Sequence, residues 1–242
     1  MNHLAWHPAT QLPGLYAIID LPDPAGLGAA QLARAMAQAP ADCRPRVLQV
    51  RAKNLSIQHL RAAVVAVSDA CRGTGVGVVV NDHVELAVSG IHGVVGVHLG
   101  QEDLDALGDP VAAIRQLRAQ AARAGHEHFC IGVSTHDLDQ VRRSRELAID
   151  YIGFGPVRRT ASKQLAEPVT GFDTLRDACT EARVPVVAIG GLSGAHAQKA
   201  LTCGARFVAM IGSLRGATPA EVRDKLIEQA QALRAPSTGT RS

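Results

Sequence analysis

Two aspartates lie directly after predicted strands, where the chain has to leave an apolar interior. Asp82 follows the β-branched residues 76–80 and Asn81, and Asp103 lies shortly after a second predicted strand, residues 93–98. If a short helix joins these strands in a βαβ unit, both carboxylates leave the same edge of the sheet and can share one hard cation. Each aspartate alone could instead cap the helix that follows it. Together they favour Mg²⁺, which typically takes one or two carboxylates and leaves its other positions to water and substrate phosphate.

Basic side chains follow other predicted strands. Arg51 and Lys53 are two residues apart on a segment that leaves its strand, and Lys163 lies on a long polar loop. A single loop lysine is usually just solvated. Three cations on a rim that also holds two metal ligands fit a pyrophosphate, because guanidinium, ammonium and Mg²⁺ together stabilise a leaving dianion. Arg158 and Arg159 could add to this field, but we expect them to keep the loop in water.

Glycines follow the last two predicted strands. Gly190 and Gly191 come after residues 184–189, and Gly212 comes after residues 206–211. Bare backbone N–H groups near helix N-termini form the usual phosphate pocket of barrel enzymes. A tight turn needs glycine just as often, so one pair is a weak signal. Glycines after both strands favour phosphate binding.

Covalent catalysis is not indicated by the spacing of the nucleophilic side chains. No arrangement of Ser, His and Asp, or of Cys and His, stands out, and no histidine pair has metalloprotease spacing. His98 ends a predicted strand, where it is equally consistent with a core histidine and with one that faces a ligand. The polar residues therefore indicate a site that binds phosphate groups.

Eight segments have the pattern of strands, and a helical pattern follows each of them. The strands are expected at residues 14–20, 46–51, 76–80, 93–98, 129–134, 150–155, 184–189 and 206–211. Their spacing of roughly 25 to 30 residues is typical of a (β/α)8 barrel, whose loops after the strands gather on one face. We predict an α/β fold with a single (β/α)8 TIM barrel. The main rival is a doubly wound open sheet, which more often has a glycine-rich turn after its first strand.

The boundaries of the domain follow from the same pattern. We expect an N-terminal leader at residues 1–13, the barrel at 14–234 and a disordered tail at 235–242, since the tail has nothing to bury. The chain has 242 residues, of which 47% are hydrophobic and only 3% aromatic, so its core must consist mainly of aliphatic residues.

The charge and the cysteine content of the chain indicate which classes of partner and which cellular compartment to expect. The net charge of +3 is spread along the chain, which does not indicate a nucleic-acid partner. The five cysteines are far apart and form no C-x-x-C motif, as expected for reduced thiols in the cytoplasm. No apolar stretch reaches the roughly 18 residues of a membrane span. We expect a cytoplasmic protein with small-molecule partners, and the sequence leaves a homo-oligomer open.

Six motifs resemble those of the thiamine-phosphate synthase (thiamine-phosphate pyrophosphorylase) family. They are QVRAK (49–53), ND (81–82), GVHLGQED (96–103), GVSTH (132–136), DYIGFGPV with TASK (150–163) and PVVAIGGL (185–192). The resemblance covers nearly the whole barrel. It implies that 4-amino-2-methyl-5-hydroxymethylpyrimidine diphosphate is joined to a thiazole phosphate, giving thiamine phosphate and pyrophosphate. In the family the pyrimidine diphosphate ionises first, and the thiazole nitrogen traps the cation.

The same resemblance implies roles at the metal and pyrophosphate. Mg²⁺ would be held by Asp82 and Asp103. The pyrophosphate would be bound by Arg51, Lys53, Asn81 and Lys163, and the catalytic residues would be Arg51, Lys53, Ser134 and Lys163.

The two heterocycles are assigned to other residues by the resemblance. Gln49 and His98 would be near the pyrimidine, and Ser134 would bridge its amine and the departing pyrophosphate. The thiazole phosphate or its carboxylated form would be contacted by Thr160 and Ser162, and its phosphate would be held by Gly191 with the backbone N–H groups of Ile211 and Gly212.

This chain departs from the family pattern in its sixth loop. Arg158 and Arg159 replace an aromatic residue and proline that commonly precede T-x-T-K, and Ser162 replaces a threonine but keeps its hydroxyl. Gly212 stands where a serine is common. Two alternatives stay open, namely a thiazole tautomerase of the same barrel family and a non-catalytic barrel that binds thiamine precursors.

Overall fold

A computed structural model describes residues 14–126, 128–160 and 168–234 of the chain. Within them, eight parallel strands form one closed barrel in sequence order. The strands are β1 (Gly14–Leu21), β2 (Val47–Ala52), β3 (Gly77–Asn81), β4 (Val94–Leu99), β5 (Cys130–Thr135), β6 (Tyr151–Phe154), β7 (Val186–Ala188) and β8 (Phe207–Met210). Pairing of Gly14 with Phe207 joins β1 to β8 and closes the sheet. The TIM barrel is confirmed, and the open-sheet alternative is wrong.

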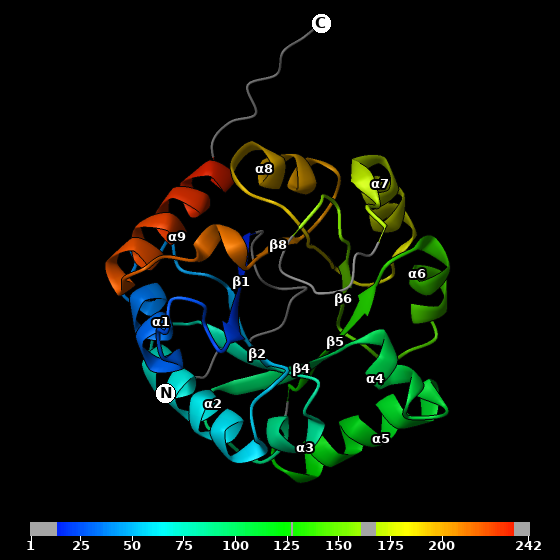
Figure 1. Cartoon of the computed structure of the whole chain (residues 1–242). Helices are drawn as coiled ribbons and strands as arrows, with labels where there is room; N and C mark the ends of the chain where they lie inside the picture. The colour runs from blue at the N-terminus through cyan, green and yellow to red at the C-terminus, as the bar shows by residue number, and fades with distance from the viewer. Residues whose placement is uncertain (1–13, 127, 161–167, 235–242) are drawn as a thin grey trace, which may run out of the picture.

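Helices surround the barrel (Figure 1). They are α1 (Ala29–Ala37), α2 (Ile57–Cys71), α3 (Val84–Ala87), α4 (Gln101–Asp105), α5 (Pro110–Arg123), α6 (Leu138–Ser144), α7 (Gly171–Glu181), α8 (Gly194–Thr202), the 3-10 helix η1 (Gly212–Leu214) and α9 (Pro219–Arg234). Local signals start several of them. The Ser56 hydroxyl accepts a hydrogen bond from the backbone of His59, and Asp109 caps α5 with Pro110 in its first turn.

The buried residues form two layers, because alternate side chains of a strand point to opposite faces. One apolar cluster fills the inside of the barrel with residues such as Tyr16, Val79, Tyr151 and Phe207. A larger cluster lies between the strands and the helices and is built mainly from Val, Leu, Ile and Ala. The aliphatic core that the composition predicts is therefore the layer outside the barrel.

All five cysteines are free thiols, and four of them are buried. None of the described helices is both long enough and apolar enough to span a membrane. The expected leader and tail, and the predicted site residues Ser162 and Lys163, lie outside the described residues.

Candidate active site

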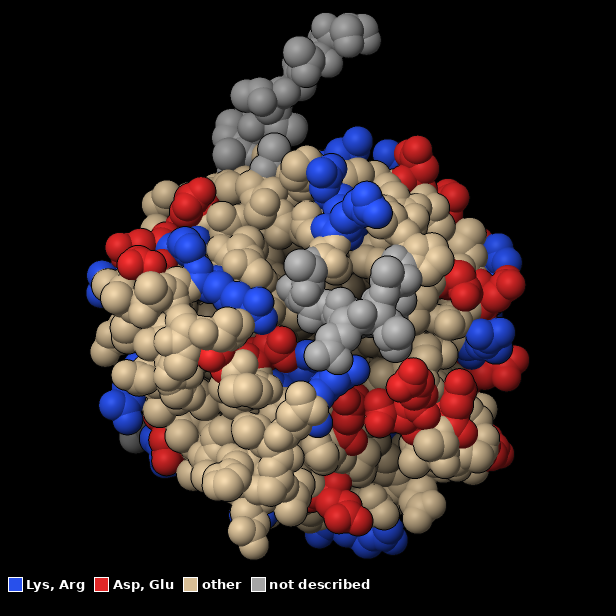
Figure 2. All heavy atoms as spheres, in the orientation of Figure 1, with Lys and Arg blue, Asp and Glu red and all other residues tan. Residues whose placement is uncertain are grey.

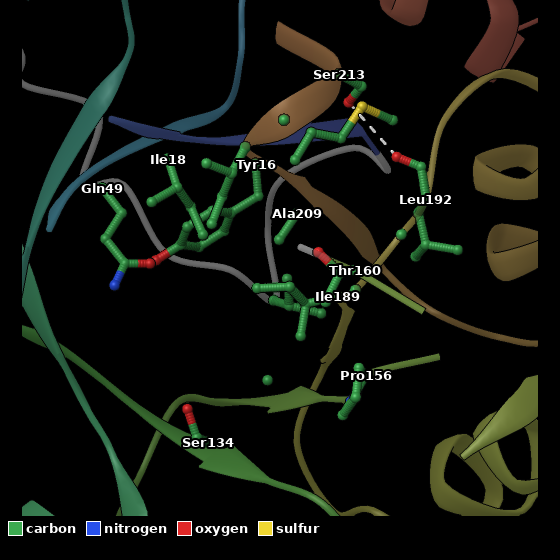
Figure 3. A pocket seen from close by; sticks show the side chains of 18 of the residues that line it. Tyr16, Ile18, Gln49, Ser134, Pro156, Thr160, Ile189, Leu192, Ala209 and Ser213 are labelled. Atoms are coloured by element: carbon green, nitrogen blue, oxygen red, sulfur yellow. Dashed lines mark hydrogen bonds between the residues drawn. The ribbon is translucent and has the colours of Figure 1, made fainter. Parts of the chain in front are cut away.

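One cavity of about 530 Å³ opens at the carboxyl ends of the strands. Every strand contributes to its wall, because residues at the same parity turn their side chains inward; Gln49 and Arg51 of β2 are one such pair. In Figure 3, Gln49 and Ser134 lie on one side of the open space, and Leu192 and Ser213 lie on the other. Side chains of β2 and β5 therefore lie across the cavity from residues that follow β7 and β8.

The two predicted metal ligands converge on Gly100. The backbone N–H of Gly100 donates a hydrogen bond to Oδ1 of Asp82 over 3.1 Å. A Cβ atom at Gly100 would lie 2.8 Å from Oδ2 of Asp103 and 3.8 Å from Oδ1 of Asp82. Neither side chain caps a helix as the simpler interpretation expected, since His83 is the N-cap of α3 and Asp103 lies within α4.

Electrostatics at this pair favour a cation. Burial, and next the charge of Asp103, raise the pKa of Asp82 to about 6 from an ordinary value of 3.8. A divalent cation would relieve the repulsion between the two carboxylates. The described residues contain no group of three or more His, Cys, Asp or Glu side chains placed to hold a metal. The donor set thus fits Mg²⁺, which keeps positions for water and phosphate oxygens.

The backbone of Asp82 is held in an unusual conformation. Its φ of 63° makes it the single non-glycine residue with a positive φ among the described residues. Such strain persists where the surroundings hold it, and it occurs often at functional sites. Here Asn81 donates from its side-chain amide to Asp82, and Gln49 donates to Asn81 over 2.5 Å. A chain of side chains from β2 to β3 therefore fixes the carboxylate.

Arg51 lines the cavity at the end of β2, and its positive charge acts on the carboxyl of Asp82. Its guanidinium forms an ion pair with Asp20 at the end of β1, and Asp20 also pairs with Arg215 over 3.4 Å. The side chain of Arg51 is only 14% exposed. Lys53, by contrast, is exposed beyond the end of β2 and does not line the cavity. The structure thus brings Arg51 and Asn81 to the site but leaves Lys53 at its margin.

A chain of hydrogen-bonded side chains crosses the inside of the barrel and lines the cavity. The hydroxyls of Tyr16 and Tyr151 are 2.9 Å apart, and Tyr151 lies 3.1 Å from Nδ1 of His98. Nε2 of His98 is in turn 3.0 Å from the hydroxyl of Ser134. Burial raises the pKa of both tyrosines far above the ordinary range, so both phenols stay protonated. His98 therefore faces the ligand space while the core holds its other side.

The opposite wall is built from the loops after β7 and β8. Gly190 and Gly191 have φ values of 99° and 62°, and Gly191 has no room for a side chain, since a Cβ would lie 2.3 Å from the carbonyl oxygen of Arg159. Ile211 and Gly212 line the same wall, where η1 begins. Glycines that precede α8 and begin η1 let a ligand approach the backbone closely, which suits an anion.

Thr160 also lines the cavity, together with its neighbour Arg159. Arg159 is exposed, as expected of a residue that keeps the loop in water, and it also borders the cavity, which the sequence did not indicate. Arg158 does not line the cavity. Of the predicted residues on this loop, only Thr160 can be placed, because Ser162 and Lys163 lie outside the described part of the chain.

Charged side chains border this face of the molecule. Figure 2 shows Lys and Arg side chains around the centre of the face and a group of acidic side chains over α4 beside it. Glu102, Asp103 and Asp105 are the exposed acidic residues of α4. The acidic side chains of α4, with the predicted metal ligand Asp103 among them, and the basic side chains therefore lie on the same face of the molecule.

Several site residues escaped the sequence analysis. Asp20 and Arg215 bracket Arg51, and Tyr16 and Tyr151 support His98. Asp20 carried the same signal as the others, a polar residue at a strand end. The tyrosines carried no such signal, because an aromatic residue inside a strand is typical of the core.

The comparisons with known proteins point in one direction. The family model described as thiamine monophosphate synthase matches residues 15–214. A thiamine-phosphate synthase of Methanocella arvoryzae is 34% identical over 83% of this chain and 86% of its own. One from Caldicellulosiruptor saccharolyticus is 33% identical over 71% of each chain. The thiamine phosphate pyrophosphorylase of Pyrococcus furiosus superposes with a TM-score of 0.70 at 22% identity, covering 91% of this chain and 95% of that one.

Proposed function

Because this chain belongs to the thiamine monophosphate synthase family and its activity is that of a thiamine-phosphate synthase, we propose that the two walls of its cavity bind the two substrates of that reaction. The pyrimidine diphosphate lies at the wall with Arg51 and the carboxylates. The thiazole phosphate lies at the wall of backbone amides after β7 and β8. The observation that supports this proposal is that one cavity is lined by Arg51 and Asn81 on one side and by Gly191, Ile211 and Gly212 on the other, while Asp82 and Asp103 lie beside it at Gly100.

The reaction needs no covalent intermediate on the protein. The bond between the pyrimidine methylene carbon and the diphosphate oxygen breaks first, and the diphosphate leaves with the electron pair. The thiazole nitrogen then donates its lone pair to the pyrimidine cation, which forms the new C–N bond. A site that stabilises charge on the leaving group is sufficient for this chemistry. The side chains around Arg51 have that character.

Asp82 and Asp103 would hold Mg²⁺ in this proposal. The ion supplies charge neutralisation on the departing diphosphate. The protein contributes the carboxylate pair, whose mutual repulsion favours a cation, and the hydrogen bonds that hold Asp82 in place. These contacts fix one ligand before any substrate arrives.

Arg51 donates hydrogen bonds to the leaving diphosphate in this scheme. Its pairing with Asp20 holds the guanidinium at the rim, so little side-chain entropy is lost on binding. Asn81 and Gln49 form the neighbouring wall. Lys53 and Lys163 complete the predicted set of cations, Lys53 from its exposed position outside the cavity.

His98 and Ser134 position the pyrimidine ring. Their hydrogen bond leaves the serine hydroxyl able to contact both the ring amine and the diphosphate, as the family resemblance implies. Gln101 donates to the backbone oxygen of Ser134 over 2.5 Å, which ties α4 and its metal ligand to β5. The metal and the pyrimidine contacts are therefore mechanically connected.

The thiazole phosphate is held by Gly191 and the backbone N–H groups of Ile211 and Gly212. Thr160 and Ser162 contact the phosphate or the carboxylate of the carboxylated form. A tautomerase has no use for a diphosphate site, so the carboxylate pair beside Arg51 supports the coupling reaction over that alternative. A binding protein without turnover has no use for the metal.

Release of pyrophosphate tests this proposal. The purified protein is supplied with both substrates and Mg²⁺, and the assay is repeated without each substrate and with EDTA. We expect release only when both substrates and the metal are present. Release of pyrophosphate from the pyrimidine substrate alone at the full rate would contradict the two-site arrangement, and no release in the complete mixture would contradict the function.

A further inference from the structure

The sixth loop lies against the glycines of the β7 wall. The backbone N–H of Val157 donates to the oxygen of Ile189 over 2.8 Å, and that of Arg158 donates to the oxygen of Gly190 over 3.0 Å. The carbonyl oxygen of Arg159 then sits where a Cβ of Gly191 would be. These contacts place Arg159 next to the backbone amides assigned to the thiazole phosphate.

The two arginines of this loop have different surroundings. Arg159 lines the cavity, whereas Arg158 does not and packs its Cβ near Gly191. Both side chains are exposed. An exposed side chain that lines a cavity is free to reach a ligand inside it. Arg158 therefore serves as a natural comparison for Arg159.

The charges of the cavity single out Arg159. Three arginines line it, namely Arg51, Arg159 and Arg215. Arg51 and Arg215 both pair with Asp20. Within residues 14–126, 128–160 and 168–234, the side chain of Arg159 has neither a carboxylate partner nor a hydrogen bond. Its charge is thus available to a ligand.

We propose that Arg159 binds the phosphate of the thiazole substrate and makes the enzyme specific for the phosphorylated thiazole over the free alcohol. This assignment rests on the proposed function and adds a side chain to its backbone site. Backbone amides donate hydrogen bonds but carry no full charge, whereas a phosphate monoester is a dianion at neutral pH. A guanidinium supplies two parallel donors and a charge in the geometry that phosphate accepts.

The test compares Arg159→Gln with wild type and with the matched control Arg158→Gln. For each protein, kcat/KM is measured with the thiazole phosphate and with the unphosphorylated thiazole alcohol, at saturating pyrimidine diphosphate. We expect Arg159→Gln to lose about 10- to 100-fold in kcat/KM for the phosphate and little for the alcohol, as for loss of one charged hydrogen-bonded contact. The KM for the pyrimidine diphosphate should not change, and Arg159→Lys should recover part of the loss.

Other outcomes overturn the assignment. Equal losses for both thiazoles, or a loss as large in Arg158→Gln, would mean that Arg159 does not read the phosphate. A loss confined to the preference for the carboxylated over the decarboxylated thiazole phosphate would assign Arg159 to the carboxylate. Unchanged melting temperatures exclude misfolding as the cause. Absence of pyrophosphate release in wild type would instead overturn the proposed function, and this assignment with it, before any variant is compared.

Discussion

At the scale of single residues, Asp82 combines a strained backbone with a carboxyl that resists ionisation. Burial and the charge of Asp103 raise its pKa to about 6. A carboxyl whose pKa is raised on folding stabilises the folded protein most below its ordinary pKa, and that contribution is lost as the pH rises through the folded value. The metal-free protein therefore carries a cost at neutral pH that a bound cation would remove.

Replacing Asp82 by Asn should remove the loss of folding stability at neutral pH and, at the same time, abolish the metal-dependent activity. Asn tolerates a positive φ and can still accept from the N–H of Gly100, so the backbone should be retained, although its amide nitrogen cannot accept the hydrogen bond that Asn81 donates to Asp82. We expect the metal-free variant to melt about 2–4 °C higher than wild type at pH 7.5, corresponding to about 1 kcal/mol in a protein of this size. Mg²⁺-dependent turnover should be lost. A lower melting temperature would show that the carboxylate is structural.

The pH dependence gives a second test at the same pair. Asp103→Asn removes the neighbouring charge, so the pKa of Asp82 should fall below about 6. The metal-free wild type should lose stability between about pH 4 and pH 6 relative to Asp82→Asn. In Asp103→Asn this loss should be smaller and should end at lower pH. Melting curves of the three proteins across that range measure it, and identical profiles for wild type and Asp103→Asn would contradict the coupling.

At the scale of elements, neighbouring strands make room for the hydrogen-bonded chain that supports His98. Gly132 of β5 faces the ring of Tyr151 on β6 so closely that a Cβ there would lie 2.0 Å from the ring. A Cβ at Gly153 would approach the ring of His98 no closer than 3.3 Å. The packing of Tyr151, and through it His98, therefore depends on Gly132.

Gly132→Ala should displace the ring of Tyr151. We expect it to destabilise the protein by about 1–3 kcal/mol, as overpacking of a core usually does. It should also raise the KM for the pyrimidine diphosphate, since His98 loses its hydrogen-bond partner. Gly153→Ala is the milder comparison for stability. Denaturant unfolding and steady-state kinetics measure both effects. An unchanged KM in a destabilised Gly132→Ala would show that the hydrogen bonds from Tyr16 to Ser134 do not contribute to substrate binding.

The sequence predicted the strand ends well and their side-chain directions partly. Gln49 and Arg51 follow from the alternation of β2, but Lys53 shares their parity and still lies outside, because β2 ends at Ala52. Thr135 ends β5 and donates to the oxygen of Gly153, and Asp137 caps α6. Asp20 and Arg51 lie opposite each other on the neighbouring strands β1 and β2, but the pairing of Asp20 with Arg215 depends on closure of the barrel between β1 and β8, which no local pattern encodes.

At the scale of the whole molecule, the stabilising layer and the chemistry occupy different parts of the barrel. The main apolar layer lies between strands and helices, whereas the site lies at the carboxyl ends of the strands. α9 belongs mainly to the stabilising layer, since it packs chiefly against α1 and α8, although it also contacts η1 and β1. Stability and substrate binding should therefore respond to different substitutions.

Leu226→Ala in α9 tests this separation. Leu226 is completely buried, so its truncation should cost about 2–5 kcal/mol of unfolding free energy. Below the melting temperature, the KM values and the Mg²⁺ requirement should stay at the wild-type level. Chemical denaturation and steady-state kinetics on the same preparation measure the two properties. A changed Mg²⁺ requirement would show that the outer layer sets the geometry of the site.

The central claim is that one cavity holds the diphosphate and the metal at one wall and the phosphate monoester at the other. A crystal structure with pyrophosphate, thiamine phosphate and Mn²⁺ in place of Mg²⁺ tests it most directly. We predict an anomalous peak within coordination distance of Asp82 and Asp103, with the pyrophosphate against Arg51 and the phosphate of the product at Gly191 and Gly212. A metal bound elsewhere, or the two phosphate groups in exchanged positions, would contradict the account.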